Sequence, residues 1–358
     1  MQRVEFAAID TVPADQLDRL TTGRGLLESA AWMRYCELAS RGSLSYTGLV
    51  DAAGRLVALT AVHHYRSEPP FAFRRPAAFL DDMVDASGCF PCVIGVLDGV
   101  HTMMLVDPSS PLPRADVVRE LVSGLAETTV AFPYFPDRAD AEAAAQALEG
   151  PALVTSAVAK LVVEWDDFEG YLGSLSKHQR SNVRRERRQY ADAGYQIEVG
   201  QGTAGLDQET ALLQTSTLTK HGTSADVAAL LEGYELLRAT VDQQVVTFRT
   251  RLDGVTKGIT VCLQDGETLY VRATGLAGDN SSFAYFNTGY YAPIEWGCAN
   301  GIRSFGYGAG APRAKQLRGC ALEPRYGAFR WPGDGPDYQA SALRRSEGVL
   351  EEIGRRSW

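Results

Sequence analysis

Apolar and polar positions follow two patterns in the first part of this chain. Residues 26–41 place apolar side chains at the three- and four-residue spacing of a helix. Residues 45–65 are rich in β-forming residues on both sides of Asp51 to Gly54, which predicts a strand, a turn and a second strand. Residues 89–106 have the same character around Asp98-Gly99, so we expect a second hairpin there.

Similar patterns return in the second half. Helical spacing, turn residues and β-rich runs follow one another in nearly the same order. The predicted elements are helices at 168–193, 207–220 and 225–241, three strands within 245–275 with turns at Asp253-Gly254 and Asp265-Gly266, a loop at 277–291, a helix from Pro293 to about Asn300, and a strand within 302–309.

The two halves share one arrangement of elements. A strand, a tight turn and a return strand follow predicted helices at Asp51 and again at Asp253. This predicts two copies of one α+β unit about 200 residues apart, although Asp-Gly hairpins are common enough for a chance likeness. We expect domains at 1–155 and 156–332, each a central mixed sheet flanked by helices, and a C-terminal helix within 333–358.

Composition narrows the class of protein. The 358 residues are 45% apolar and 22% charged, which excludes a disordered or collagen-like chain, and six cysteines are too sparse for a disulfide scaffold. The net charge of −9 argues against a protein that coats duplex DNA. The first residues lack the apolar core of a signal peptide, and no window approaches the ~18 apolar residues of a membrane span. We therefore expect a cytoplasmic protein without membrane contact.

The most unusual segment runs from Ser176 to Arg188. It holds six basic residues and a single acid, Glu186, a net charge of +5 in an acidic chain. Like charges at helical spacing repel by a few tenths of a kcal/mol per pair, and phosphates of RNA, coenzyme A or a nucleotide-linked substrate would offset that repulsion. A solvated helix face is the alternative. The candidates for binding donor phosphates are Lys177, Arg180, Arg184, Arg185 and Arg188.

Short motifs for metal or redox chemistry are weak. Cys89 and Cys92 have a ligand-like spacing, but no second ligand pair stands at the usual distance in sequence, and burial beside an apolar strand is the simpler interpretation. His63 and His64 would point to opposite faces of a strand, which argues against joint ligation. We expect no metal and no redox cofactor. His221, after a predicted helix, is a candidate general base or a capping histidine.

Two glycine-containing segments could bring backbone close to a ligand. Arg272 to Ala277 fits the pattern R-x-x-G-x-A, which in GNAT acetyltransferases opens a helix that holds the coenzyme A pyrophosphate. The next predicted helix begins only near Pro293, so we interpret the match as accidental. Residues 306–319 are predicted to form a glycine-rich flexible loop that carries Lys315 and Arg318, with a mobile surface loop as the alternative.

The second half resembles the BioF2-like acetyltransferase family of the GNAT superfamily and the related FemAB-type proteins. The resemblance covers roughly residues 160–332 and rests on motifs in the expected order. These are F-x-x-Y-L-x-S-L-S-K-x-x-R-x-N-V-R-R-E-R-R at 168–188, the Asp253-Gly254 hairpin, the Pro293 helix and K-x-x-R-G at 315–319. It implies two GNAT-like lobes in tandem, the first a degenerate copy, and transfer of an aminoacyl group from aminoacyl-tRNA to an amine. The chain lacks the coiled-coil insertion and the F-K-x-G-F ending of the peptidoglycan enzymes, so a small-molecule or peptide acceptor is expected.

The resemblance implies that Lys315 lies near the reacting carbonyl. The other candidates come from the residues themselves: His221 and Glu295 for acid–base catalysis, backbone N–H groups of Ala273, Thr274 and Gly275 for the oxyanion, and Arg272, Tyr290, Tyr307 and Arg318 for substrate binding. No cofactor beyond the aminoacyl-tRNA co-substrate is expected. An acyl-CoA-dependent N-acyltransferase and a non-catalytic GNAT-fold binding module are the alternatives.

Overall fold

A computed structural model of the chain describes residues 1–40, 43–69, 72–86, 89, 92–123, 125, 127–220, 226–278, 282–333 and 337–354. The described residues form two compact units. The first comprises Met1–Val158 and the described residues from Glu323 onward, and the second comprises Ala159–Leu322. This division differs from the expected one at 156–332, because the last strand of the chain pairs within the first unit.

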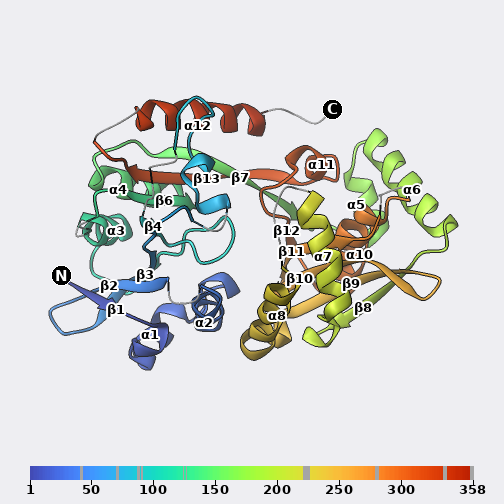
Figure 1. The fold of residues 1–358 in the computed structure, drawn as a ribbon, viewed down its shortest axis with the longest axis horizontal. Coiled ribbons are helices and arrows are strands. Elements are labelled where there is room, and N and C mark those ends of the chain that lie inside the picture. Colours follow the sequence, from blue (N-terminus) through green and yellow to red (C-terminus); the bar gives the residue numbers. More distant parts are fainter. Residues whose placement is uncertain are drawn as a thin grey trace. The chain divides into compact units, whose positions relative to one another are not determined.

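The first unit is a mixed sheet flanked by helices (Figure 1). Its strands are β1 (Gln2–Phe6), β2 (Leu44–Val50), β3 (Leu56–His63), β4 (Cys92–Ile94), β5 (Leu105–Val106), β6 (Val130–Phe135) and β13 (Ala321–Arg330). Its helices are α1 (Ala14–Thr21), α2 (Ala30–Ala39), α3 (Arg114–Ser123), α4 (Arg138–Ala147) and α12 (Tyr338–Gly354). Apolar side chains of α3 and α4, among them Leu121 and Ala144, join Phe132 of β6 in one buried core.

The second unit has the same general design. Its strands are β8 (Gln196–Gln201), β9 (Val245–Leu252), β10 (Val255–Asp265), β11 (Thr268–Leu276) and β12 (Ser304–Gly306), together with the second half of β7 (Leu153–Val162). Its helices are α5 (Phe168–Ser174), α6 (Lys177–Asp192), α7 (Gln208–Lys220), α8 (Val227–Val241), α9 (Ala284–Phe286), the π-helix η7 (Asn287–Tyr291), α10 (Ala292–Ala299) and α11 (Pro312–Gln316). No helix among the described residues is long and apolar enough to cross a bilayer.

The strands of the two units follow the same order. It is β1-β2-β3-β4-β6-β13 in the first unit and β8-β9-β10-β11-β12-β7 in the second. In each unit the fourth and fifth strands of this order are parallel, namely β4 with β6 and β11 with β12. The second and third strands form an antiparallel hairpin, β2 with β3 and β9 with β10. The fifth and sixth strands are also antiparallel, β6 with β13 and β12 with β7. The turns at Asp51 and Asp253 both join the second strand to the third. The predicted α+β repeat is therefore confirmed.

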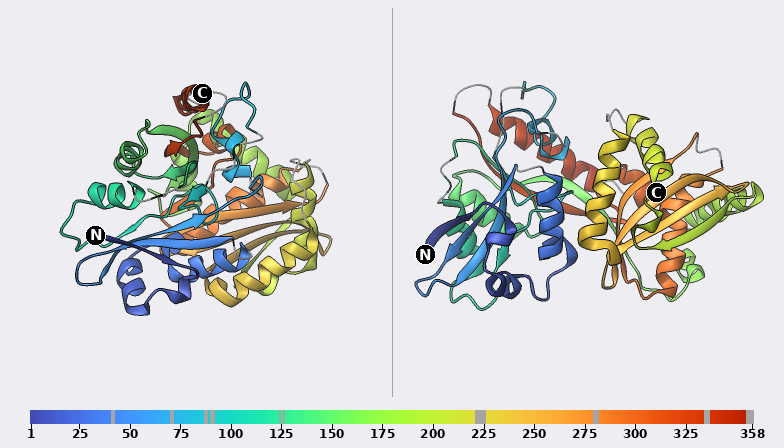
Figure 2. Two further views of the ribbon diagram at one scale, coloured as in Figure 1. Left: turned by 60° about the vertical axis from the view of Figure 1, so that its left-hand side comes forward. Right: turned by 60° about the horizontal axis from the view of Figure 1, so that its bottom comes forward.

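Helices pack on both faces of the second sheet. In the right-hand view of Figure 2, α7 and α8, in yellow, lie along one side of the orange strands. Gly275 of β11 lies against α7 so closely that a Cβ atom there would be 2.6 Å from the backbone nitrogen of Gln214. On the opposite face, Gly289 of η7 approaches the hydroxyls of Thr260 and Thr274. Successive residues of β11 thus face different helices, as the alternation of a strand requires.

Three predicted elements differ from the structure. The helix expected at 168–193 is interrupted, because the Ser176 side chain accepts from the backbone N–H of Gln179 and starts a new helix with a capping box. The loop expected at 277–291 is helical from Ala284, where Tyr290 and Tyr291 are buried. Burial of these aromatic side chains outweighs the loop-forming composition of the segment.

The segment around Asp98-Gly99, expected to be a hairpin of two paired strands, also differs from the prediction. The chain reverses there through an isolated bridge between Val96 and Thr102. The strands on either side, β4 and β5, do not pair with each other in the described structure, because both pair with β3.

Candidate functional site

The parallel strands β11 and β12 pair over only a short stretch. Their ladder runs from Thr268 to Tyr270 on β11, whereas β11 stays paired with β10 as far as Leu276. The register between β10 and β11 also shifts here, because Val261 pairs with Ala273 and Cys262 with Val271. This β-bulge leaves Arg272 as the extra residue of β11. Bulges of this kind re-aim backbone and side chains and are common beside active sites.

Lys315 of α11 lies against the segment that follows β12. Its Nζ donates to the carbonyl oxygens of Tyr307, at 2.5 Å, and Gly308, at 2.9 Å. The residue is only 6% exposed, and burial lowers the pKa of the amine to about 8. No carboxylate in the described part of the chain lies within ion-pair distance of Nζ. The flexible loop expected around Lys315 is therefore wrong, because the residue lies in α11 and its two hydrogen bonds hold the side chain inside the unit.

Lys315 can keep both hydrogen bonds in either protonation state. The ammonium form has three N–H donors, of which the carbonyls of Tyr307 and Gly308 use two. The neutral amine still has two donors, and its lone pair then takes the third position. That position can therefore donate to an oxyanion or accept a proton, without a change in the observed contacts.

Tyr307, whose carbonyl accepts from Lys315, begins a cluster of buried aromatic side chains. Tyr307 stacks on Tyr290 with ring centroids 4.7 Å apart, and both rings are buried. Within the described structure the hydroxyls of Tyr307 and Thr288 are buried without a hydrogen-bond partner. Because buried polar atoms are normally satisfied, these hydroxyls mark places where a ligand or a water would complete the bonding. Thr288 belongs to η7, and single π turns are frequent at functional sites.

Arg318 forms the buried centre of a second cluster. Its guanidinium pairs with Glu186 Oε2 at 2.8 Å and lies 3.3 Å from the ring centroid of Phe286. The Tyr291 hydroxyl donates to the same carboxylate. The side chains of Arg318 and Glu186 are 6% and 9% exposed. Arg318, expected to bind substrate, is instead held inside the unit, where it fixes α6 against η7 and the end of α11.

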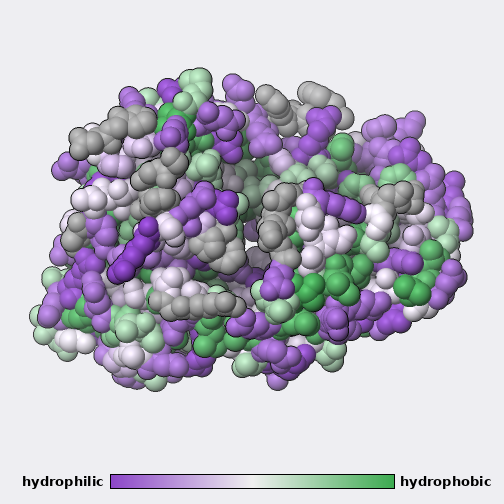
Figure 3. Space-filling model, viewed as in Figure 1, coloured by the Kyte–Doolittle hydropathy of each residue, from purple (hydrophilic) through white to green (hydrophobic). Residues whose placement is uncertain are grey.

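The inward position of Glu186 changes the charge of the α6 surface. With the only acid of the segment buried, all six basic residues remain on the half-buried and exposed faces. Within the described part of the chain two of them have acidic partners, Arg184 with Glu169 at 2.9 Å and Arg187 with Glu295 at 2.8 Å. Hydrophilic side chains accordingly dominate the margin over α6 in the space-filling view (Figure 3). The exposed basic residues are Lys177, Arg184, Arg185 and Arg188, and Arg180 is half-buried.

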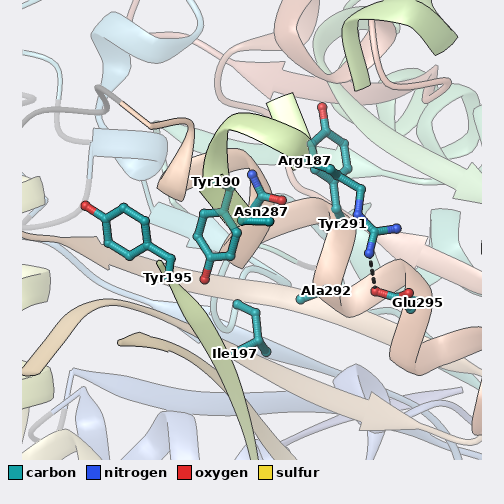
Figure 4. Close-up of a pocket in the computed structure, with 9 residues that line it drawn as sticks. Arg187, Tyr190, Tyr195, Ile197, Asn287, Tyr291, Ala292 and Glu295 are labelled. Carbon is teal, nitrogen blue, oxygen red and sulfur yellow. Dashed lines mark hydrogen bonds and ion pairs between the residues drawn. The ribbon is translucent and has the colours of Figure 1, made fainter. Parts of the chain in front are cut away.

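A pocket of about 200 Å³ lies beneath α6, between β8 and η7 (Figure 4). Tyr190 and Tyr195 stack at 5.1 Å along one side, and Asn287 lies next to the Tyr190 ring. Glu295 lines the same pocket and is directed toward Arg187. Among the described residues no hydrogen bond or ion pair joins Glu295 to Lys315. The two residues expected to share one catalytic site are therefore not brought into contact.

The structure places the remaining candidates as follows. Thr274 Oγ1 lies 3.3 Å from Thr260 Oγ1 and faces η7, whereas Gly275 faces α7. Ala273 and Arg272 lie at the β-bulge. His221 falls outside the described residues. Lys315, Tyr307, Tyr290 and Arg318 form one continuous set of contacts, because the Arg318 guanidinium also lies 5.5 Å from the Tyr290 ring centroid.

Sequence reasoning missed the role of Glu186. The signal was present, because Glu186 stands three residues after Val183 and four before Tyr190, and this spacing places it on one helix face with these two side chains. All three residues are buried. Thr288 and Phe286 were missed because the segment that holds them was assigned to a loop.

A family model of FemAB-like proteins, described as peptidoglycan biosynthesis/recognition, matches residues 132–337. A crystal structure of FemX is 11% identical and covers 92% of this chain and 97% of its own, with a TM-score of 0.57. L-PGS from Bacillus licheniformis is 13% identical over 96% and 98%, with a TM-score of 0.54. A tandem GNAT protein from the clavulanic acid biosynthesis pathway is 16% identical over 93% and 99%, with a TM-score of 0.50. These likenesses show the fold alone. No curated protein sequence matches the chain.

Proposed function

This chain belongs to the FemAB-like family, and from that premise we propose that it is an acyltransferase that forms an amide bond, with aminoacyl-tRNA as the donor. The acceptor is an amine of a small molecule or peptide. Structural likeness to FemX and to a tandem GNAT protein supports transfer chemistry on this fold.

The observation that carries the proposal is the environment of Lys315. A buried amine with a pKa of about 8 and no carboxylate partner among the described residues is costly to keep, and such perturbed groups cluster at functional sites. Its two hydrogen bonds use two of its three hydrogen-bonding positions, and we assign the third to the substrate. The two carbonyls that accept from Lys315 follow β12 directly, close to where β11 and β12 part.

The reaction needs no covalent intermediate with the protein, because the aminoacyl ester is already activated. The acceptor amine attacks the ester carbonyl, a C–N bond forms, and the C–O bond to the tRNA ribose breaks. The amine proton leaves with the ribose oxygen or passes to solvent. Proximity supplies much of the acceleration, and Lys315 in its ammonium form donates to the developing oxyanion or holds an acceptor carboxylate. The basic surface of α6 binds donor phosphates.

An acyl-CoA donor is the second candidate. It is favoured by the β-bulge at Arg272 and the short β11–β12 ladder, because a bulge beside a point where two strands part can present backbone groups to a small ligand. The basic face of α6 suits the phosphates of either donor. The two candidates therefore differ in the donor and share the same transfer site.

The test compares donors directly. The protein is incubated with charged total tRNA or with acetyl-CoA, each with a metabolite extract, and new amides are detected by mass spectrometry. Product that disappears after RNase treatment supports the tRNA donor, and product that survives it and needs acetyl-CoA supports the second candidate. No product with either donor would indicate a binding module without catalysis.

A further inference from the structure

Three residues from neighbouring strands of the first unit meet at one end of the sheet. The antiparallel register of β3 and β4 pairs His63 with Val93, and it places His64 opposite Cys92 at the next position. Glu127 lies just before β6, whose Val130 pairs with Cys92. Directly opposed residues share one face of a sheet, so the His64 and Cys92 side chains are neighbours although they are distant in sequence.

The donor atoms of these residues converge. One ligand atom from each of His64, Cys92 and Glu127 lies within 4.8 Å of the others. The Nδ1 atom of His64 is 3.9 Å from Glu127 Oε1. Donor atoms around a tetrahedral zinc ion are about 3.3–3.6 Å apart at bond lengths of about 2.0–2.3 Å. The side chain of His64 is 56% exposed, so solvent rather than packed side chains surrounds much of the ring.

The backbone holds two of the three ligands in place. The Cys92 N–H donates to the carbonyl of Thr129 at 3.0 Å. The Arg330 guanidinium donates to the carbonyls of Leu125, at 3.1 Å, and Glu127, at 2.9 Å. The segment that carries Glu127 is therefore anchored to β13.

One carboxylate oxygen of the cluster has no partner among the described residues. The Oε2 atom of Glu127 is buried and has no hydrogen-bond partner in the described structure. The Cys92 side chain is buried as well. A bound divalent cation supplies the missing partner of the carboxylate and favours the thiolate.

We propose that His64, Cys92 and Glu127 form a zinc site in the first unit, independent of the transfer site in the second. One imidazole, one thiolate and one carboxylate make a donor set that Zn²⁺ accepts and that Mg²⁺ or Ca²⁺ does not favour. On binding, a Zn–S bond forms and the thiol proton passes to solvent. Three protein ligands leave a fourth position for water, on the solvent side where His64 lies.

Cobalt reports the thiolate ligand directly. The full chain is freed of metal with EDTA and titrated with Co²⁺, and then with Zn²⁺. We expect one equivalent of Co²⁺ to bind with a thiolate-to-cobalt charge-transfer band, and Zn²⁺ to remove that band. Cys92→Ser should abolish the band. The matched control is Cys89→Ser, because Cys89 is also buried but is not part of the cluster, and this variant should keep the band.

Cys92→Ser could lose the band because it misfolds, and His64→Gln controls for this, because the exposed side chain can be replaced without disturbing the core. It should weaken Co²⁺ binding at least tenfold, and Glu127→Gln should do the same. Absence of the band in the wild-type protein overturns the proposal. So does a band that survives Cys92→Ser, or wild-type affinity in His64→Gln.

Discussion

Glu186 of α6 and Arg318, which follows α11, form an ion pair of 2.8 Å with both side chains at least nine-tenths buried. The two residues are 132 positions apart in the sequence. The Tyr291 hydroxyl donates to the same carboxylate, and the Phe286 ring lies against the guanidinium. One contact therefore ties together the basic helix, the π turn and the helix that carries Lys315.

Removing one partner of this pair should destabilise the protein strongly. Glu186→Gln leaves the Arg318 charge buried without its counter-ion, and breaking a buried pair costs about 3–5 kcal/mol. Urea unfolding measures the loss. The control is Glu169→Gln, which breaks the exposed pair with Arg184 and should change stability by no more than about 1 kcal/mol. Equal effects of the two variants would contradict the structural role of Glu186.

The α6 surface should determine how donor binding responds to salt. Replacing Arg184, Arg185 and Arg188 by Ala should weaken tRNA binding, and each lost phosphate contact lowers the salt slope by about 0.7–0.9. Glu169→Gln should have the opposite effect on affinity, because it frees Arg184 from its ion pair. The matched control is Arg138→Ala, an exposed arginine of the first unit. Affinity and slope that stay unchanged in the triple variant would make α6 a solvated face.

Lys315 should be required for turnover. Lys315→Met keeps most of the side-chain volume and removes the amine, and loss of a positioned donor costs on the order of 10²–10³ in rate. Stability should also fall, by about 1–3 kcal/mol, because the carbonyls of Tyr307 and Gly308 lose their donor. Assays below the melting temperature separate the two effects. Lys315→Arg tests whether charge alone suffices, and near-normal turnover in Lys315→Met would refute the assignment.

The same lysine should make stability depend on pH in a definite direction. Burial lowers the pKa of Lys315 from 10.5 to about 8, so between these values the unfolded chain binds a proton that the folded chain does not. The free energy of unfolding contributed by this group therefore rises with pH across that window. Urea midpoints measured at several pH values should show this increase in the wild type relative to Lys315→Met. Parallel curves for the two proteins would show that the amine titrates normally.

Local signals in the sequence predicted the repeat of the α+β unit. The burial and the partners of the site residues depend on long-range packing and could not be predicted in this way. The Asp51 and Asp253 turns could be read directly, because turn chemistry depends on a few adjacent residues. The burial of Lys315 could not be predicted from the sequence, because the glycine-rich residues around it are typical of a loop. His64 and Cys92 were each judged with a sequence neighbour, and their true neighbours are across the sheet. Glu186 was counted as a surface charge because its partner comes 132 residues later.

Gly275 offers a test of whether the R-x-x-G-x-A match has a binding role. A Cβ atom at this position would lie 2.6 Å from backbone atoms of Leu213 and Gln214, which cannot move without shifting α7. Gly275→Ala should therefore destabilise the protein by about 1–3 kcal/mol through overpacking. Gly233→Ala is the control, because no atom lies within 4 Å of a Cβ there and alanine favours the helix α8. If Gly275 instead approached a donor pyrophosphate, Gly275→Ala would lower donor affinity while the unfolding midpoint stayed at the wild-type value. Loss of stability, with the affinity of the remaining folded protein unchanged, would show that this glycine is required for the contact between α7 and β11.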